Sequence, residues 1–327
     1  MSGMGEIIIT DEDGVPMVPP EKKPKAVRAD AYLLLTAALW GLAFAAQREG
    51  MEHVGPFLFN GVRFALGALA LVPLMLWMRA RNATKTVPTS VDDKPSTNGR
   101  LLWTGGLFAG LILFVAASLQ QVGLVTTAAT NAGFITGLYV VLVPVFGIAL
   151  GRRTGIGTWL GVALVFAGLY LLSVGPEFSM SDGDVLVLFG AIFWAFHVLT
   201  IGYLAPSLDP FKLAAFQYGV CAAISFGLAL AFEEISMTGL SGAWLPILYA
   251  GLVSVGIAYT LQVVAQRDAH PAHASIILSL EAAFAALGGW LVLGESLDTR
   301  GMVGCALMLA GMVASQLWAL RSPTPTA

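Results

Sequence analysis

The sequence predicts an all-α integral membrane protein whose ten transmembrane helices form two inverted five-helix repeats, with both termini cytoplasmic. Three observations lead to this prediction. Apolar residues make up 57% of the chain, charged residues only 11%, and the mean hydropathy is +0.79. The apolar residues gather in ten segments, each near the length of about 20 residues that a helix needs to cross a bilayer. The two halves of the apolar region also share matching residues at regular distances.

The ten apolar segments follow one another along the chain and are separated by short polar connections. Their length excludes β-barrel strands, whose sequence signal is an alternation over roughly ten residues. The predicted spans are residues 31–47, 57–78, 101–121, 127–150, 156–173, 184–204, 210–232, 244–266, 273–293 and 301–320.

The internal repeat appears as residues that recur at a nearly constant offset. Trp40 and Trp194 lie 154 residues apart (194 minus 40), and each is followed at the same distance by Pro-Phe. Later matches have offsets of 142 and 143, because the first copy carries a polar insert near residues 82–98. They pair Leu119-Gln120 with Leu261-Gln262, and Gly161–Gly168 with Gly304–Gly311. Since each copy has five helices, an odd number, the copies cross the membrane in opposite senses, as in secondary transporters that hold substrate between two halves.

The repeat sets the expected domain boundaries. Residues 30–174 form the first five-helix repeat, which includes a polar cytoplasmic loop at 80–99, and residues 183–320 form the second. Residues 1–29 are polar and contain four prolines, without the apolar core of a secretory signal, so they are expected to be a retained and disordered cytoplasmic tail. Residues 321–327 are expected to be a short C-terminal tail.

Lysine and arginine residues determine the predicted orientation. With the N-terminus in the cytoplasm, the outer side holds only Arg48 and Arg300, while Arg63 and Lys212 fall within helices. Cytoplasmic loops carry the excess of basic residues in membrane proteins, so this orientation is strongly favoured. The thirteen basic residues on the cytoplasmic side are Lys22, Lys23, Lys25, Arg28, Arg79, Arg81, Lys85, Lys94, Arg100, Arg152, Arg153, Arg267 and Arg321.

Several short motifs carry a family resemblance over residues 30 to 320. They are Ala38-Leu-Trp40-Gly41, Gly55-Pro56-Phe57, Arg63-Phe64, the run from Gly133 to Tyr139, Leu280-Glu281 and Leu293-Gly-Glu295. With these motifs, the chain resembles the EamA-type members of the drug/metabolite transporter superfamily. Ala282 departs from the pattern, since family members often have proline after this glutamate. The resemblance implies a ten-helix permease with a central cavity, often an exporter of small metabolites such as amino acids.

Glu281 is the sharpest candidate for a functional residue. It lies about nine residues into its predicted span, near the bilayer midplane. A charged side chain there is costly, so an intramembrane carboxylate is expected to face a cavity or a partner. It could contact a substrate amine or carry a proton. The alternative is a protonated or hydrogen-bonded residue that only packs the bundle.

Aromatic residues suggest the walls of a cavity. Trp40 and Trp194 occupy equivalent repeat positions near the midplane, whereas tryptophan is usually enriched at the membrane interfaces. Phe44 extends the Trp40 face by one turn, and His197 extends the Trp194 face. Such a surface could stack on flat or cationic substrates. The alternatives are tight packing between two helices and, for His197, an ordinary buried hydrogen bond.

Polar residues recur at matching positions of the two copies. Asn131 and Tyr139 match His273 and Glu281 at an offset of 142, and Gln120 matches Gln262. We therefore expect these side chains, with Tyr259 one turn before Gln262, to line the same cavity. Interhelical hydrogen bonding is the alternative for all of them.

Two further features have structural interpretations. Arg63 is expected to reach the outer headgroups or to pair with Glu49 or Glu52, with binding of a substrate carboxylate as the alternative. The small faces around Gly161 and Gly304 are expected to pack the fifth helix against the tenth, with homodimerisation as the alternative.

These observations predict a secondary transporter and exporter of small organic metabolites, with amino acids as the first expectation, working by alternating access. The sequence shows no nucleophile, nucleotide-binding or metal-ligand motif, so we expect no enzymatic activity, cofactor, metal or nucleic-acid partner. The expected partners are a small-molecule substrate, the lipid bilayer and, as an option, a coupling proton, for a monomer or weak homodimer in the bacterial plasma (inner) membrane. The alternatives are drug or dye efflux and a membrane sensor or scaffold that transports nothing.

Overall fold

The computed structural model describes residues 22–83, 99–152, 154–173, 180–295 and 298–321. Every regular element in these ranges is helical, which confirms the predicted all-α class. The predicted disorder of the tails and most of the polar loop fall outside the described residues. The helices are α1 (Lys22–Gly50), α2 (Pro56–Ala83), α3 (Gly99–Gly123), α4 (Ala129–Gly137), α5 (Tyr139–Ala149), α6 (Ile156–Ser173), α7 (Asp182–Leu204), η1 (Ala205–Ser207), α8 (Pro210–Phe232), α9 (Met237–Gly242), α10 (Trp244–Leu248), η2 (Tyr249–Tyr259), α11 (Thr260–Ala265), α12 (Pro271–Leu278), α13 (Glu281–Leu293) and α14 (Thr299–Arg321).

Eight helical stretches in the described ranges are long and apolar enough to cross a bilayer. The protein is therefore a multi-pass integral membrane protein. Two more predicted spans correspond to helices whose apolar stretches are shorter, Ile156–Leu171 in α6 and Thr299–Ser315 in α14. Three of the long stretches combine consecutive helices: α4 with α5, α12 with α13, and α10, η2 and α11.

The first helix begins earlier than the sequence predicts. Residues 22–29 were expected to belong to a disordered tail, but α1 begins at Lys22. The cause is local: lysine and alanine are good helix formers, and Pro24 falls in the first turn, where a missing backbone N–H costs nothing.

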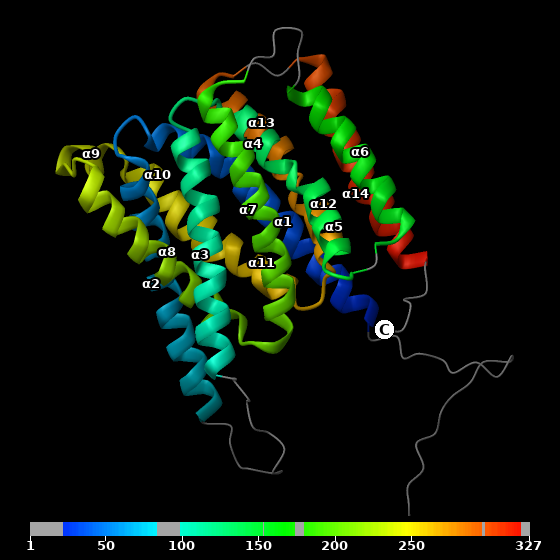
Figure 1. The fold of residues 1–327 in the computed structure, drawn as a ribbon, viewed down its shortest axis with the longest axis horizontal. Coiled ribbons are helices and arrows are strands. Elements are labelled where there is room, and N and C mark those ends of the chain that lie inside the picture. Colours follow the sequence, from blue (N-terminus) through cyan, green and yellow to red (C-terminus); the bar gives the residue numbers. More distant parts are fainter. Residues whose placement is uncertain (1–21, 84–98, 153, 174–179, 296–297, 322–327) are drawn as a thin grey trace, which may run out of the picture.

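Helices from the two halves of the chain pack against each other throughout the bundle. The main neighbours are α6 with α14, α2 with α8, α3 with α7 and α1 with α13. Figure 1 shows α6 and α14 side by side at one edge of the bundle. There a Cβ on Gly168 would lie 2.5 Å from the carbonyl oxygen of Gly304, and one on Gly311 would lie 2.8 Å from that of Gly161. These glycines let two backbones touch, which confirms the predicted packing of the fifth helix on the tenth.

Two spans are broken at matching positions. The α4–α5 span turns at Leu138, and the α12–α13 span turns at Ser279 and Leu280, so Tyr139 and Glu281 each begin a second half-helix. Pro144 weakens the first span because it cannot donate a backbone hydrogen bond. The second span breaks without a proline: the Ser279 hydroxyl donates to the carbonyl of Ile276 at 2.8 Å, and such back-bonding bends helices.

The bundle has two ends that are distinguished below. Figure 1 shows the start of α1, the end of α14, the end of α2 and the start of α3 on the same side; we call this the terminal end. The α1–α2 connection and the end of α13 lie on the opposite side, which we call the distal end.

Candidate substrate site

A small cavity lies between the two halves of the chain. Its volume is about 20 Å³, room for about one water molecule, so the centre is closed in this conformation. Nine helical elements contribute to its walls, and they come from both predicted repeats. The lining residues are Trp40, Phe44, Gln47, Arg63, Gln120, Thr136, Tyr139, Trp194, Val198, Ser254, Tyr259, Gln262 and Glu281.

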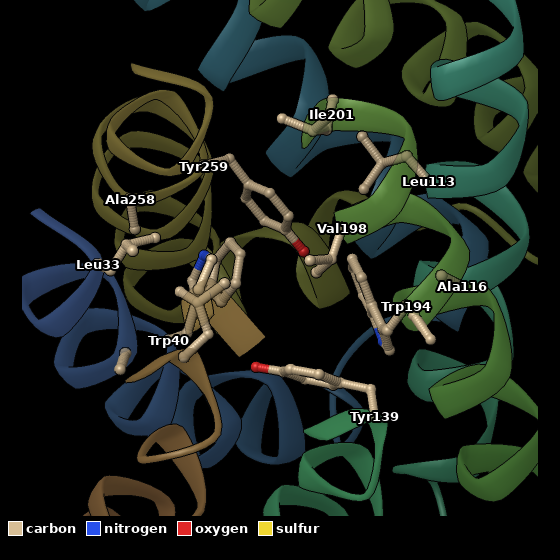
Figure 2. Close-up of a cluster of buried hydrophobic side chains, with 14 of the residues drawn as sticks. Leu33, Trp40, Leu113, Ala116, Tyr139, Trp194, Val198, Ile201, Ala258 and Tyr259 are labelled. Carbon is tan, nitrogen blue, oxygen red and sulfur yellow. The ribbon is translucent and has the colours of Figure 1, made fainter. Parts of the chain in front are cut away.

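Aromatic rings form one side of this cavity. The ring of Tyr259 contacts both tryptophans: its centroid lies 4.3 Å from that of Trp40 and 5.9 Å from that of Trp194. The ring centroids of the two tryptophans lie 6.4 Å apart. In Figure 2 these three rings and the ring of Tyr139 surround the same central space. The deep, repeat-related tryptophans are therefore next to each other, and their faces can accept an apolar, flat or cationic group.

The wall residue Tyr259 ends an unusual helix. η2 (Tyr249–Tyr259) is a π-helix, a wide form that is rare and occurs mostly as short segments at functional sites. Two of its carbonyls accept hydrogen bonds from α1: Ser254 O from Trp40 Nε1 at 3.3 Å, and Ala258 O from Thr36 Oγ1 at 3.1 Å. These bonds fix Trp40 against the second half of the chain.

A chain of hydrogen bonds runs along the other side of the cavity. Trp194 Nε1 donates to Gln120 Oε1 at 2.7 Å, and Gln120 Nε2 donates to Gln47 Oε1 at 3.4 Å. Gln47 Oε1 also accepts from Arg63 Nη1 at 2.7 Å, and Arg63 Nε donates to Asn60 Oδ1 at 2.9 Å. This chain of hydrogen bonds links α7, α3, α1 and α2 across the cavity.

Arg63 corrects a prediction made from the sequence. It was expected to reach the outer headgroups or to pair with Glu49 or Glu52, but only 1% of it is exposed and it lines the cavity. Hydrogen bonds to Asn60 and Gln47 hold its guanidinium inward. Within the described residues no carboxylate lies within 4 Å of its guanidinium, and Nη2 has no hydrogen-bond partner. A buried cation left in this state is a candidate anion-binding group.

Glu281 provides the opposite charge. It is 3% exposed and lines the same cavity, and its Oε1 has no hydrogen-bond partner in the described structure. Tyr139, its match in the first repeat, is its neighbour in the cavity, and the Tyr139 hydroxyl makes no hydrogen bond of ordinary length within the described residues. The amide of Gln262 completes the group, since neither its oxygen nor its nitrogen is hydrogen-bonded there.

The cavity unites most, though not all, of the predicted site residues. Those that line it are Trp40, Phe44, Gln120, Tyr139, Trp194, Tyr259, Gln262 and Glu281. The other three lie elsewhere. His197 pairs with Gln217 at 2.8 Å behind the aromatic wall, and His273 contacts Asp30 at 3.0 Å and Ser315 at 3.3 Å. Asn131 is half-buried near the start of α4.

Five lining residues were not among the predicted ones. Gln47 and Arg63 carried a signal, because polar residues inside an apolar span are rare. Thr136, Val198 and Ser254 carried none, since small and apolar residues are common throughout spanning helices.

At the distal end, two carboxylates from the second half of the chain bind helix N-termini of the first half. Glu233 accepts hydrogen bonds from the backbone N–H groups of Phe57 and Leu58, both at 2.7 Å, at the start of α2. Glu295 accepts from the N–H groups of Ala129 (3.0 Å) and Thr130 (3.1 Å) and from the Thr130 hydroxyl, at the start of α4. We call these contacts the distal clasps. A carboxylate suits a helix N-terminus because of the free N–H groups and the helix dipole.

The terminal end is built differently. The N-termini of α8 and α12 are capped locally, by the side chains of Asp209 and His270. The repeat offsets show which first-half residues correspond to the two clasp glutamates. Arg79 corresponds to Glu233 (233 minus 154), and Arg152 corresponds to Glu295 (295 minus 143). A cation cannot cap a helix N-terminus, and among the described residues this end has no clasp of the distal kind. The only ion pair among the described residues, between His273 and Asp30, joins α12 to α1 here.

Comparison with known proteins identifies the family. The model of the EamA-like transporter family matches the chain twice, at residues 27–174 and 181–315. The chain belongs to this family. It is therefore a membrane transporter.

Two relatives show how far the similarity extends. An uncharacterized transporter of Archaeoglobus fulgidus is 29% identical over 293 residues, which cover 88% of this chain and 86% of the relative. The uncharacterized inner membrane transporter YedA of Escherichia coli is 29% identical over 275 residues, with 80% and 81% covered. A crystal structure with 21% identity shares the fold at a TM-score of 0.67, covering 90% of this chain and 99% of its own.

Proposed function

We propose that this family member is a secondary transporter that exports amino acids, aromatic or apolar ones first, by alternating access. The observation that carries the proposal is one closed cavity that holds an unpartnered guanidinium nitrogen of Arg63 and an unpartnered carboxylate oxygen of Glu281. Opposite charges that each keep one unpartnered buried atom match a zwitterion, because the α-carboxylate and the α-ammonium each need a partner once they leave water.

The roles of the wall residues follow from this match. Arg63 binds the carboxylate through Nη2, while Gln47 and Asn60 hold the guanidinium in place. Glu281 binds the ammonium. The side chain of the amino acid packs on Trp40, Trp194 and Tyr259.

Alternating access explains the small size of the cavity. A volume of about 20 Å³ is far below the size of an amino acid, so loading requires the two halves to move apart. We propose that α6 and α14 also span the bilayer, which gives ten spans in two inverted repeats. The terminal end, which holds most of the basic residues, then faces the cytoplasm of a bacterial inner membrane.

The proposed direction rests on the difference between the two ends. The distal clasps close the outer end with five hydrogen bonds, while at the terminal end the described residues join the halves through one ion pair, between His273 and Asp30. The resting equilibrium then favours states closed to the outside, which load from the cytoplasm. An exporter needs this bias. Glu281 also offers a site for a coupling proton, which would compete with the substrate ammonium for the same oxygens.

Ligand-dependent thermal stability of the purified protein tests the proposal. The panel holds the twenty amino acids, nucleosides, polyamines, sugars and cationic dyes. A ligand that binds only the folded state at a hundredfold excess over Kd stabilises it by about 2.7 kcal/mol. We expect stabilisation by an amino acid, lost in both Arg63→Gln and Glu281→Gln and weakened in Trp40→Ala and Trp194→Ala. Lys212→Gln is the matched control, since Lys212 lies at the terminal end of α8, outside the cavity lining.

Other outcomes have a defined meaning. Stabilisation by dyes alone would replace amino acid export with drug efflux. Binding of an amino acid without any flux in sealed vesicles would make the protein a sensor or scaffold. Equal stabilisation of the wild type and of both charge variants would refute the proposed site.

A further inference from the structure

A second, larger hollow lies apart from the central cavity. Its volume is about 850 Å³, and it runs between α3 and α7 to the end of α5, at the terminal end of the bundle. It shares no lining residue with the central cavity. Most of its walls are apolar, with Phe108 and Ile112 on α3 facing Phe193 and Phe196 on α7, so we call it the lateral groove.

The lateral groove is open at the surface that the apolar helices present to the bilayer. Phe108 and Tyr203 on its rim are 58% and 69% exposed. Its inner wall is fixed: the rings of Phe146 and Phe196 stack at 4.8 Å with 4° between their planes. An apolar groove with a firm wall and an open side fits a flexible hydrocarbon chain.

Arg152 is the one cation among the described residues that line this groove. Arg152 follows Gly151, a residue with a positive φ of 78°, which turns the chain after α5 and places the arginine among the lining residues. Within the described residues its guanidinium has no carboxylate within 4 Å. The pKa of the neighbouring His270 is lowered, first by burial and then by Arg152 and His273. Arg152 is thus the cation that this end of the groove offers to a ligand.

The second repeat has a residue of opposite charge at the corresponding position. Gly294 also has a positive φ, 67°, and precedes Glu295. Glu295 is the second-repeat residue that corresponds to Arg152. Glu295 supplies its own negative charge to the nearby α4 N-terminus. At the corresponding place near α12 the chain carries the positive charge of Arg152 instead, while the α12 N-terminus is capped by His270.

We propose that the lateral groove binds an anionic glycerophospholipid of the cytoplasmic leaflet, with its phosphate on Arg152 and an acyl chain between α3 and α7. The proposal rests on the orientation given under the proposed function and on no property of the central cavity. Charge complementarity favours this occupant: the cytoplasmic leaflet carries the anionic lipids, and basic pockets between spanning helices on that side bind their headgroups. A neutral lipid would leave the guanidinium unpaired.

Native mass spectrometry of the full chain, released from detergent with defined lipids, tests this site. The probes are phosphatidylglycerol and phosphatidylethanolamine with the same acyl chains. We expect the wild type to retain phosphatidylglycerol in preference. Arg152→Gln should lose this preference, with phosphatidylglycerol binding weakened about fivefold, as expected for one basic residue near an anionic headgroup. Arg79→Gln removes an arginine from an exposed part of α2, outside the groove lining, and should keep it.

A second variant tests the groove itself. Thr104→Trp adds bulk at an exposed lining position of α3 and should weaken binding of both lipids. Its folding is checked by the thermal unfolding of the purified variant without ligand, compared with the wild type. Equal retention of the two lipids by the wild type, or an unchanged preference in Arg152→Gln, would overturn the proposal. Because lipid retention is read separately from amino acid binding, failure of either proposal leaves the other testable.

Discussion

Replacing Glu295 with glutamine should loosen the distal end of the bundle. The carboxylate accepts two backbone hydrogen bonds, at 3.0 and 3.1 Å, and one from the Thr130 hydroxyl. Glutamine keeps a single acceptor oxygen and turns an NH2 group toward donors. Loss of an N-cap costs about 1 kcal/mol, and loss of a negative charge at a helix N-terminus up to about 1 kcal/mol more. A total of about 2 kcal/mol is about a 30-fold change in the ratio of open to closed molecules.

Cysteine labelling from outside the cell measures this change. The reporter is Thr136→Cys, a cavity position that is buried in the closed conformation. The two native cysteines, Cys221 and Cys305, are replaced by serine so that only the reporter reacts. The labelling rate by a membrane-impermeant thiol reagent is proportional to the small open fraction, so Glu295→Gln should raise it by about 30-fold.

A matched control isolates the clasp. Glu52→Gln removes the same charge from an exposed distal position and should leave the labelling rate unchanged. If Glu295→Gln also labels at the wild-type rate, the clasp does not hold the outer end closed, and the argument for the direction of transport fails with it.

Three further predictions use close contacts of the bundle. Gly168→Ala places a Cβ 2.5 Å from a carbonyl of α14 and should destabilise the protein by about 1–3 kcal/mol in thermal unfolding, whereas Gly219→Ala, with open space around it, should not. Gln120→Leu leaves the indole N–H of Trp194 without its acceptor, and should cost about 1–3 kcal/mol of stability and weaken amino acid binding. Gly55→Ala places a Cβ against the carboxylate of the α2 clasp and should raise labelling of the cavity cysteine, as in the Glu295 variant; a rate equal to wild type would contradict this.

The sequence predicted the parts of the fold that depend on local patterns. Long apolar segments predicted the helices, and the glycines at a constant offset predicted the contact of α6 with α14. Aromatic and polar residues at matching positions of the two copies, such as Trp40 with Trp194 and Gln120 with Gln262, helped to predict eight residues that line the cavity. Such predictions succeed because a residue that breaks the apolar pattern in a span has few environments open to it.

The features that depend on distant contacts could not be predicted. Arg63 was expected to reach the surface because it lies close to the start of α2. Its hydrogen bonds to Gln47 and Asn60 hold the side chain in the cavity instead. The break before Glu281 comes from a serine hydroxyl rather than a proline. The distal clasp of Glu295 joins residues more than 160 positions apart, and no local pattern links them.

Binding of three related ligands tests the central claim most directly. They are L-phenylalanine, phenethylamine, which lacks the carboxylate, and 3-phenylpropanoate, which lacks the ammonium, measured on the wild type and on Arg63→Gln. The account predicts that the wild type binds the amino acid at least about 100-fold more tightly than either analogue, because each leaves one buried charge unpaired. It also predicts that Arg63→Gln no longer distinguishes the amino acid from the amine. If the wild type binds the amine as tightly as the amino acid, the cavity does not recognise a zwitterion.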